Sequence, residues 1–336
     1  MSSVKKNPSN KKTVSGDNSL NNSMLIDCYK EMVRIRIFEE NIARCYREGL
    51  ISGFCHLYIG QEAIATGFHF ASVEGDSFIT SYRCHSFGLM RGISMASLFA
   101  ELFGRSSGSS KGKGGSMHIF HPEGGFFGGH GIVGAQVSIG TGLAMANKQK
   151  SKQNVCFVFL GDGALNQGQV YESFNLAKVF SLPVVYVIEN NIYAMGTSVN
   201  RSSANSENLH QRCIGFGIKG IKIDGMNLLE TYNTAQYARD YALQNGPILI
   251  NAVTYRYHGH SMSDPAKYRS KKEVDDVKNN RDPINGLMSY ILSNKLETKG
   301  NLNAIEQDVI KETELAKTLA SSAPEPDLQE LYTNVY

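Results

Sequence analysis

Two polar turns in this sequence carry residue types that suit a metal ion and a phosphate group. Gly161-Asp162-Gly163 follows the apolar run Val155 to Leu160, and Glu189-Asn190-Asn191 follows the apolar run Pro183 to Ile188. Aspartate and amide oxygens are hard ligands that suit Mg²⁺ or Ca²⁺ and disfavour soft metals. The two turns are therefore the first place to look for chemistry.

The spacing between the turns predicts that they act together. The segment from about Gly168 to Ser181 has a helical pattern, so the order is strand, turn, helix, strand, turn. Neighbouring parallel strands lie about 4.8 Å apart, which would let Asp162 and Asn191 reach one ion. The amides of Gly163 and Ala164 open toward the helix, where anions bind well. A Gly-Asp-Gly triplet alone is more often a turn with a capping aspartate, but this pairing predicts a site for a divalent cation and a diphosphate.

Strands and helices alternate along the rest of the chain, which predicts the α/β class. A mainly parallel sheet with helices on both faces follows from this order, and ligands of such sheets bind beyond the carboxyl ends of the strands. Further strands are expected at Phe78–Tyr82, Gly220–Gly225 and Pro247–Arg256, and helices at Gln61–Ala71, Ser94–Phe103 and from Ile132 onward.

The chain divides into three predicted parts. Residues 1–23 are rich in Ser, Asn and Lys and are expected to be a disordered tail. Residues 24–281 are expected to form the α/β domain, and residues 282–336 a helical segment packed on the same domain. The tail holds four Lys against one Asp (4 − 1 = +3), which equals the net charge of the whole chain. The remainder is thus balanced, and a basic nucleic-acid groove is not indicated.

A glycine-rich segment from Gly104 to Gly131 stands apart in composition. Ten of its 28 residues are glycine, and it also contains Lys111, Lys113 and His118. A long segment of this kind inside a compact domain is usually a functional loop. Its glycines would let backbone amides approach a ligand closely, and a plain surface loop is the alternative.

The composition also excludes several classes of protein. The sequence contains neither a run of about 18 apolar residues nor the apolar core of a signal peptide, so we expect a soluble protein without membrane contact. The six cysteines show no C-x-x-C pair and no zinc-type spacing with histidine. They are expected to be reduced and mostly buried.

The paired turns resemble the thiamine-diphosphate binding motif, which runs from Gly-Asp-Gly to Asn-Asn. The likeness extends from about Met24 to Tyr336, and over this length the chain resembles the α subunits of pyruvate dehydrogenases. The segments that carry it are Phe54–Ala63, Lys111–His118, Gly131–Gln136, Met195–Val199 and Tyr255–Pro265.

The resemblance implies a role for individual residues. Mg²⁺ would be held by Asp162, Asn191 and the carbonyl of Tyr193. Thiamine diphosphate would be bound by Tyr82, Arg83, Gly131, Val133, Asp162, Gly163, Ala164, Asn191 and His260. His260 would lie beside the reacting centre and His56 near the substrate, as the two candidate catalytic residues. Each histidine taken singly is more often a structural one.

The resemblance also implies a reaction and its partners. The expected activity is the oxidative decarboxylation of pyruvate, with transfer of the acetyl group to the lipoyl group of the dihydrolipoyl acetyltransferase. Thiamine enzymes use a Glu from a separate pyrimidine-binding domain, and this chain is too short for two such domains. We therefore expect a β subunit, an α₂β₂ heterotetramer with the cofactor at the interface, and little activity from this chain alone.

Three readings remain open at this point. The leading one is the pyruvate-specific α subunit, favoured by the His56 and His260 segments. The α subunit of a branched-chain 2-oxoacid or acetoin dehydrogenase would share the metal motif, and a non-catalytic subunit could retain the fold. The tail contains no Arg and is a poor mitochondrial presequence, which favours a bacterial cytoplasm over the mitochondrial matrix.

Overall fold

The computed structural model describes residues 20–335 of the chain. The disordered tail is predicted for residues 1–23, and its residues 1–19 lie outside the described residues. Helix α1 (Asn22–Arg47) begins within the last residues of that segment, because the Asn21 side chain caps it by accepting a hydrogen bond from the Met24 amide. Within residues 20–335, no helix is sufficiently long and apolar to span a bilayer.

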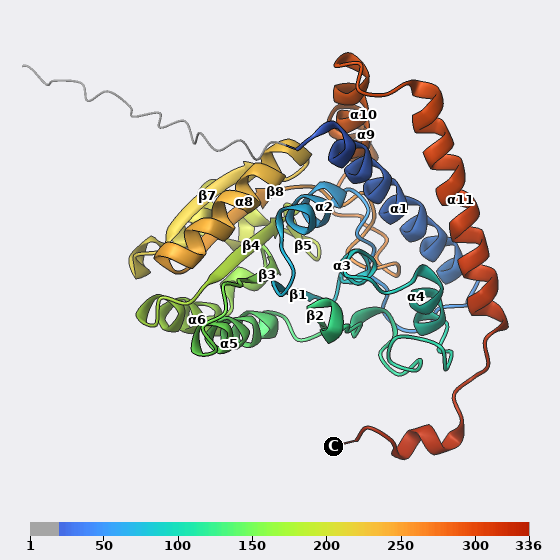
Figure 1. Cartoon of the computed structure of the whole chain (residues 1–336), viewed down its shortest axis with the longest axis horizontal. Helices are drawn as coiled ribbons and strands as arrows, with labels where there is room; N and C mark the ends of the chain where they lie inside the picture. The colour runs from blue at the N-terminus through green and yellow to red at the C-terminus, as the bar shows by residue number, and fades with distance from the viewer. Residues whose placement is uncertain (1–19, 336) are drawn as a thin grey trace, which may run out of the picture.

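A six-stranded sheet in the order β2-β1-β3-β4-β8-β7 forms the centre of the molecule (Figure 1). Each strand is parallel to its neighbours, so the carboxyl ends of all six meet at one edge. This confirms the predicted α/β class with a parallel sheet. The strands are β1 (Ser77–Ser81), β2 (Phe126–His130), β3 (Cys156–Gly161), β4 (Val184–Asn190), β7 (Lys219–Asp224) and β8 (Ile248–Val253), and a small separate hairpin is formed by β5 (Tyr193–Ala194) and β6 (Thr197–Ser198).

Helices cover both faces of the sheet, with α2 and α8 on one face and α5 and α6 on the other (Figure 1). The apolar residues of β3 and β4 alternate between the two hydrophobic clusters, and every residue of β4 is buried. Two-sided burial explains why these strands read as continuous apolar runs in the sequence. The six cysteines are unpaired and buried, as predicted.

The helices match most of the predicted ones to within a few residues. They are α1 (Asn22–Arg47), α2 (Glu62–Ala71), α3 (His85–Met90), α4 (Met95–Leu102), α5 (Ala135–Gln149), α6 (Gly168–Val179), α7 (Val199–Ser202), α8 (Leu228–Asn245), α9 (Lys271–Arg281), α10 (Pro283–Ser293) and α11 (Lys299–Ser322), with 3₁₀ turns η1 (Gly115–Met117), η2 (Pro122–Gly124), η3 (Ala164–Asn166), η4 (Ser206–Phe216) and η5 (Leu328–Tyr332). Helix α9 was not predicted, because it buries no side chain completely and shows no apolar stripe.

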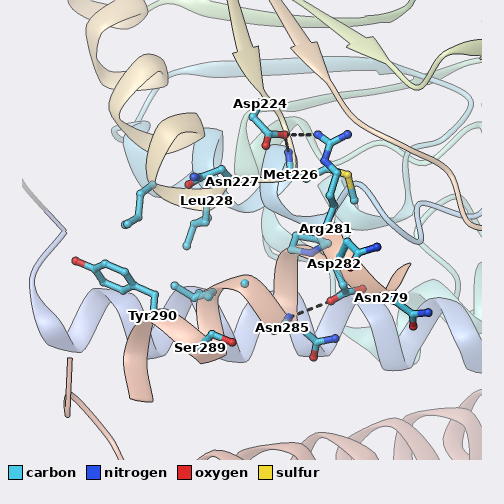
Figure 2. Close-up of a pocket in the computed structure, with 15 residues that line it drawn as sticks. Asp224, Met226, Asn227, Leu228, Asn279, Arg281, Asp282, Asn285, Ser289 and Tyr290 are labelled. Carbon is cyan, nitrogen blue, oxygen red and sulfur yellow. Dashed lines mark hydrogen bonds and ion pairs between the residues drawn. The ribbon is translucent and has the colours of Figure 1, made fainter. Parts of the chain in front are cut away.

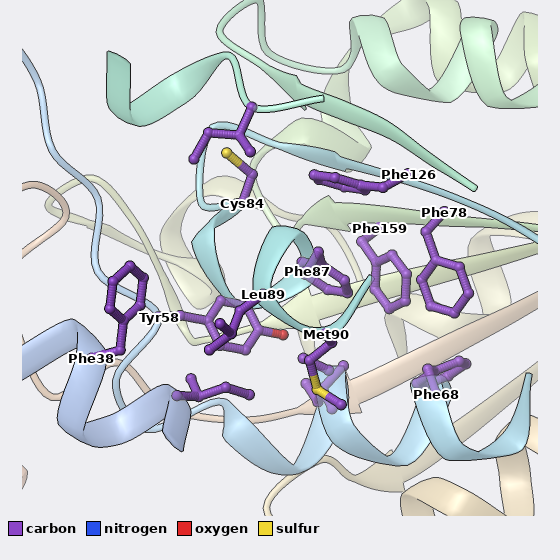
Figure 3. Close-up of a cluster of buried hydrophobic side chains, with 14 of the residues drawn as sticks. Phe38, Tyr58, Phe68, Phe78, Cys84, Phe87, Leu89, Met90, Phe126 and Phe159 are labelled. Atoms are coloured by element: carbon purple, nitrogen blue, oxygen red, sulfur yellow. The ribbon is translucent and has the colours of Figure 1, made fainter. Parts of the chain in front are cut away.

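An aromatic cluster beneath α3 fixes the end of β1 (Figure 3). The ring of Phe87 on α3 lies 4.5 Å from that of Phe159 on β3, and Phe159 lies 5.4 Å from Phe68 on α2. Aromatic pairs of this kind contribute about 0.5–1.5 kcal/mol beyond their buried area. Since α3 begins two residues after Arg83, this packing holds Arg83 at the carboxyl edge of the sheet.

The C-terminal helices pack on the first helix of the chain. Leu287 of α10 and Leu302 and Val309 of α11 share one buried cluster with Leu25 and Tyr29 of α1. Beyond α11 the chain crosses to the glycine-rich segment, where Glu330 forms ion pairs with Lys111 at 2.9 Å and Lys113 at 3.1 Å. The C-terminal segment thus contacts both the first helix and the glycine-rich segment.

The glycine-rich segment folds around a buried carboxylate of α4. Glu101 is fully buried, and its carboxylate oxygens accept hydrogen bonds of 2.7–3.0 Å from the backbone amides of Ser110, Gly112, Gly114 and Gly115. A side chain at Gly108 would collide with this carboxylate, since its Cβ would lie 2.4 Å from Oε2. The sequence suggested that amides of this segment approach a ligand. Four of them, between residues 110 and 115, instead donate hydrogen bonds to Glu101.

Replacing Glu101 with Gln tests this arrangement. The amide keeps the shape of the side chain but presents N–H groups to two backbone donors, so we expect the free energy of unfolding to fall by roughly 2–4 kcal/mol. Urea unfolding measures this change. Glu325→Gln is the control, because Glu325 forms an exposed ion pair with Arg105 that should contribute about 0–1 kcal/mol. Equal losses in the two variants would contradict the assigned role of Glu101.

Candidate active site

The carboxyl edge of the sheet carries a cavity of about 330 Å³. Nine of the eleven residues predicted for the site line it, namely Tyr82, Arg83, Val133, Asp162, Gly163, Ala164, Asn191, Tyr193 and His260. Gly131 and His56 do not line it. The parallel sheet explains this convergence, because Tyr82, Asp162 and Asn191 each follow the last residue of a different strand.

Asp162 and Asn191 lie side by side, as their spacing predicted. Gly161 of β3 is paired with Glu189 of β4, which places the two polar turns at the same level. Asp162 is 2% exposed, and its Oδ2 has no hydrogen-bond partner among residues 20–335. Burial raises the pKa of Asp162 to about 6, although its own amide, Arg256 and the Asn191 amide oppose the shift. A buried carboxylate oxygen without a partner suits a cation.

The third predicted metal ligand, the Tyr193 carbonyl, lies on the β5–β6 hairpin. A side chain at Gly163 would collide with Ala194 of the same hairpin, since its Cβ would lie 2.6 Å from the Ala194 Cβ. Glycine is thus required for the Asp162 turn to approach the hairpin closely. No group of three or more His, Cys, Asp or Glu residues placed to hold a metal ion occurs in the described part of the chain. One carboxylate with an amide and a peptide oxygen fits a hard ion that retains phosphate or water ligands.

Arg83 connects two segments that are far apart in the sequence. Its guanidinium donates to the carbonyl of Leu57 at 2.5 Å and to the carbonyl of His260 at 2.9 Å. Arg83 is 4% exposed and forms no ion pair with the carboxylates of residues 20–335. Burial, followed by the charge of Arg256, lowers the pKa of Arg83 to about 10. Arg83 lines the cavity, and a buried guanidinium without a direct carboxylate partner among the described residues suits an anion.

Three aromatic rings pack at one end of this site. The ring of His56 lies 4.3 Å from that of Tyr82 and 5.2 Å from that of His260. Burial and then Arg83 lower the pKa of His56 to about 2 and that of His260 to about 3. Both histidines are therefore neutral near pH 7, so each ring has one nitrogen that donates and one that accepts.

The segment after β2 contains the two residues predicted to contact the cofactor ring. Val133 borders the cavity and is 42% exposed, and the neighbouring Ile132 is 75% exposed. Gly131 packs against the ring of His118, from which an added Cβ would lie 3.3 Å away. Within the glycine-rich segment, Gly131 therefore packs on His118, while the amides of Ser110, Gly112, Gly114 and Gly115 face Glu101.

The loop after β8 holds His260 in place. The carboxylate of Asp264 accepts hydrogen bonds from the His260 amide at 2.6 Å, the Ala266 amide at 2.9 Å and the Tyr268 hydroxyl at 2.9 Å. Arg269 donates to the carbonyls of residues 256 and 258 at 2.5 Å each. These contacts orient the backbone on both sides of His260.

Sequence reasoning missed several polar residues of the site. Glu189 lines the cavity and accepts a hydrogen bond of 2.5 Å from the hydroxyl of Tyr58, and burial raises its pKa to about 7. Gln136 lines it as well, and Arg256 and Gln61 both contact Asn191. All four of these residues lie in or beside a segment that carries the family resemblance. That resemblance is the sequence signal that would have identified them.

A second cavity, of about 430 Å³, opens where α8 and α10 begin (Figure 2). None of the predicted site residues lines it, and its Arg281 forms an ion pair with Asp224 at 2.8 Å. Asp282 in its wall caps α10 and accepts a hydrogen bond of 2.9 Å from the hydroxyl of Tyr257. This second cavity is therefore linked to the active site by the hydrogen bond to Tyr257, which lies in the loop that leads to His260.

The fold and this site define a member of a known family of enzymes. The family of the dehydrogenase E1 component matches residues 30–329, and the chain belongs to it. This family depends on thiamine diphosphate, in agreement with the resemblance carried by the Gly161–Asn191 unit.

The most similar relatives point to one kind of E1 component. The chain is 52% identical over 312 residues to a pyruvate dehydrogenase E1 component subunit alpha from Rickettsia felis, covering 93% of this chain and 95% of the relative. It is 50% identical over 311 residues to the protein of that name from Rhizobium meliloti, covering 92% and 89%. A mitochondrial form from Dictyostelium discoideum is 46% identical over 318 residues, covering 94% and 83%.

The low pKa values of His56 and His260 predict a pH dependence. The unfolded chain binds protons on these rings below about pH 6.5 and the folded chain does not, so their contribution to stability is complete above that pH and falls as the pH drops. We expect ¹³C-histidine NMR of the chain to show no titration of either ring between pH 5 and 8. The His56→Asn and His260→Asn variants assign the signals, and a midpoint near 6.5 for either ring would contradict the assigned environment.

Proposed function

We propose that this chain is the α subunit of a pyruvate dehydrogenase, which decarboxylates pyruvate oxidatively and passes the acetyl group to a lipoyl group of the dihydrolipoyl acetyltransferase. The observation that carries the proposal is one cavity lined both by Asp162, whose Oδ2 has no partner among residues 20–335, and by Arg83, whose guanidinium is bound there only by backbone carbonyls. That combination suits a divalent cation together with a diphosphate. The names of the relatives support pyruvate as the substrate.

The residues of the cavity fit the metal and the cofactor. Asp162, Asn191 and the Tyr193 carbonyl would hold Mg²⁺, whose charge would help to bind the diphosphate. Arg83 would add charge-assisted hydrogen bonds to the diphosphate, and the amides of Gly163 and Ala164 would donate to it. Tyr82, Gly131 and Val133 would complete the binding site for the cofactor.

The bound cofactor supplies the electron sink for decarboxylation. The protein must orient the substrate against it, exclude water and move protons. His260 and His56 are neutral and lie in contact with each other. In the neutral form each ring has one nitrogen that donates and one that accepts a hydrogen bond, and we infer that the two candidate catalytic histidines act on the substrate through these contacts.

The site also needs a second chain. Val133 and Met195 line the cavity and Ile132 precedes Val133 in the chain; all three are exposed apolar residues, and Met195 is 61% exposed. An apolar rim at the mouth of a polar cavity supports burial against a partner. We infer that this partner is the β subunit, which would supply the pyrimidine-binding half of the site in an α₂β₂ heterotetramer. The similarity to bacterial relatives supports a bacterial cytoplasmic enzyme.

The metal assignment predicts the behaviour of Asp162→Asn. Thiamine diphosphate is titrated by calorimetry into the complex of this chain with its β subunit, at a series of Mg²⁺ concentrations. We expect the Mg²⁺ requirement to rise by more than about 100-fold, since changes to residues that only support a ligand already cost about 10–100-fold. Asp308→Asn is the matched control, because Asp308 is an exposed residue of α11. An unchanged Mg²⁺ requirement would refute the metal role and favour a non-catalytic subunit.

The substrate assignment is tested on the same complex. We expect kcat/KM for pyruvate to exceed that for 3-methyl-2-oxobutanoate by about 10–200-fold, the range that small differences in apolar bulk allow. Acetoin provides a third substrate. A preference for the branched 2-oxoacid or for acetoin would replace pyruvate dehydrogenase with one of the two alternatives.

A further inference from the structure

Arg256 makes an unusual set of contacts beside the metal ligands. It follows β8, is 1% exposed, and uses all three guanidinium nitrogens. Nε donates to Asn191 Oδ1 at 3.0 Å, Nη2 to the Tyr193 carbonyl at 2.9 Å, and Nη1 to the His258 carbonyl at 3.3 Å. Two of these acceptors are the oxygens assigned to Mg²⁺. Arg256 therefore contacts two of the three assigned ligands at once.

The contacts of Asn191 determine which atom of its amide faces which neighbour. Arginine has only donors, so the atom of Asn191 that faces Arg256 must be the oxygen. The Asn191 amide nitrogen donates to Gln61 Oε1 at 3.0 Å, and Gln61 is fully buried at the start of α2. Rotation of the amide by 180° would place N–H groups against the guanidinium and two oxygens against each other. Arg256 and Gln61 together fix the direction of Asn191 Oδ1.

A hydrogen bond from Arg256 does not prevent these oxygens from binding a metal. A carbonyl oxygen has two lone pairs, and a single donor occupies one of them. Mg²⁺ requires nearly ideal octahedral geometry at about 2.0–2.1 Å, whereas Ca²⁺ accepts irregular geometry at about 2.3–2.6 Å. Fixed ligand directions therefore matter more for Mg²⁺ than for Ca²⁺.

We propose that Arg256 and Gln61 are positioning residues that set the preference of the site for Mg²⁺. Arg256 directs two ligand oxygens, on Asn191 and Tyr193, and Gln61 prevents Asn191 from turning its nitrogen toward the ion. This inference rests on the proposed function, because it requires a metal at Asp162, Asn191 and Tyr193. It adds two residues to the site and a property, metal selectivity, that depends on them.

The test measures metal selectivity rather than turnover. Thiamine diphosphate binding to the complex with the β subunit is titrated by calorimetry with Mg²⁺ and, separately, with Ca²⁺. For Gln61→Met and Arg256→Lys we expect the Mg²⁺ concentration at half-saturation to rise by about 10–100-fold and the Ca²⁺ value to change less. Lysine keeps the charge but lacks the planar fork that reaches two oxygens. Gln61→Glu retains an oxygen acceptor for Asn191 and should return the Mg²⁺ to Ca²⁺ ratio toward wild type.

Controls separate a positioning role from a structural one. Arg239→Met removes a mostly buried ion pair with Asp76, far along the sequence from the site; it should lower stability without changing the Mg²⁺ to Ca²⁺ ratio. An unchanged ratio in Gln61→Met, or equal losses for both ions, would overturn the inference. An increased Mg²⁺ affinity in Arg256→Lys would also overturn it, because Arg256 would then compete with the metal. If the wild-type complex bound the cofactor without a divalent ion, the proposed function itself would fail.

Discussion

Parallel strand pairing is the constraint on which the rest of this structure depends. The strands are covered on both faces, so their side chains are used in packing and polar groups become accessible only where a strand ends. Because all six strands run the same way, those ends meet at one edge. Residues from turns separated by many tens of residues therefore line one cavity, and no single loop has to carry the site.

The electrostatics of the cavity follow from that burial. Arg83 and Arg256 lie out of water and are held by carbonyl oxygens, and Asp162 keeps one oxygen free among the residues described. A buried charge without a direct counter-ion is costly. The same arrangement is favourable once an anion and a cation enter together, since each then meets an opposite charge in a medium of low dielectric constant. The fold thus maintains charges that a diphosphate and a divalent ion can balance.

The parts that the sequence predicted well are those determined locally. Asp162 and Asn191 could be placed because each lies in the polar turn after an apolar run, and Arg83 because it follows a short strand pattern. Helix α9 could not, because it buries no side chain completely. Glu101 could not be assigned either, because nothing in the sequence of its helix indicates that four distant amides will surround its carboxylate. The contacts of Asn191 with Arg256 and Gln61 join residues 65 and 130 positions apart, which no local pattern reveals.

The contacts that fix the predicted site residues are made within this chain. The polar contacts that orient the predicted metal ligands and His260 come from Arg256, Gln61 and Asp264, all within this chain. At the mouth of the cavity, Ile132, Val133 and Met195 form an exposed apolar rim. A second subunit therefore does not need to rearrange the phosphate and metal end of the cavity. Under the proposed function, the second subunit would bury that rim and supply groups for the other end of the cofactor.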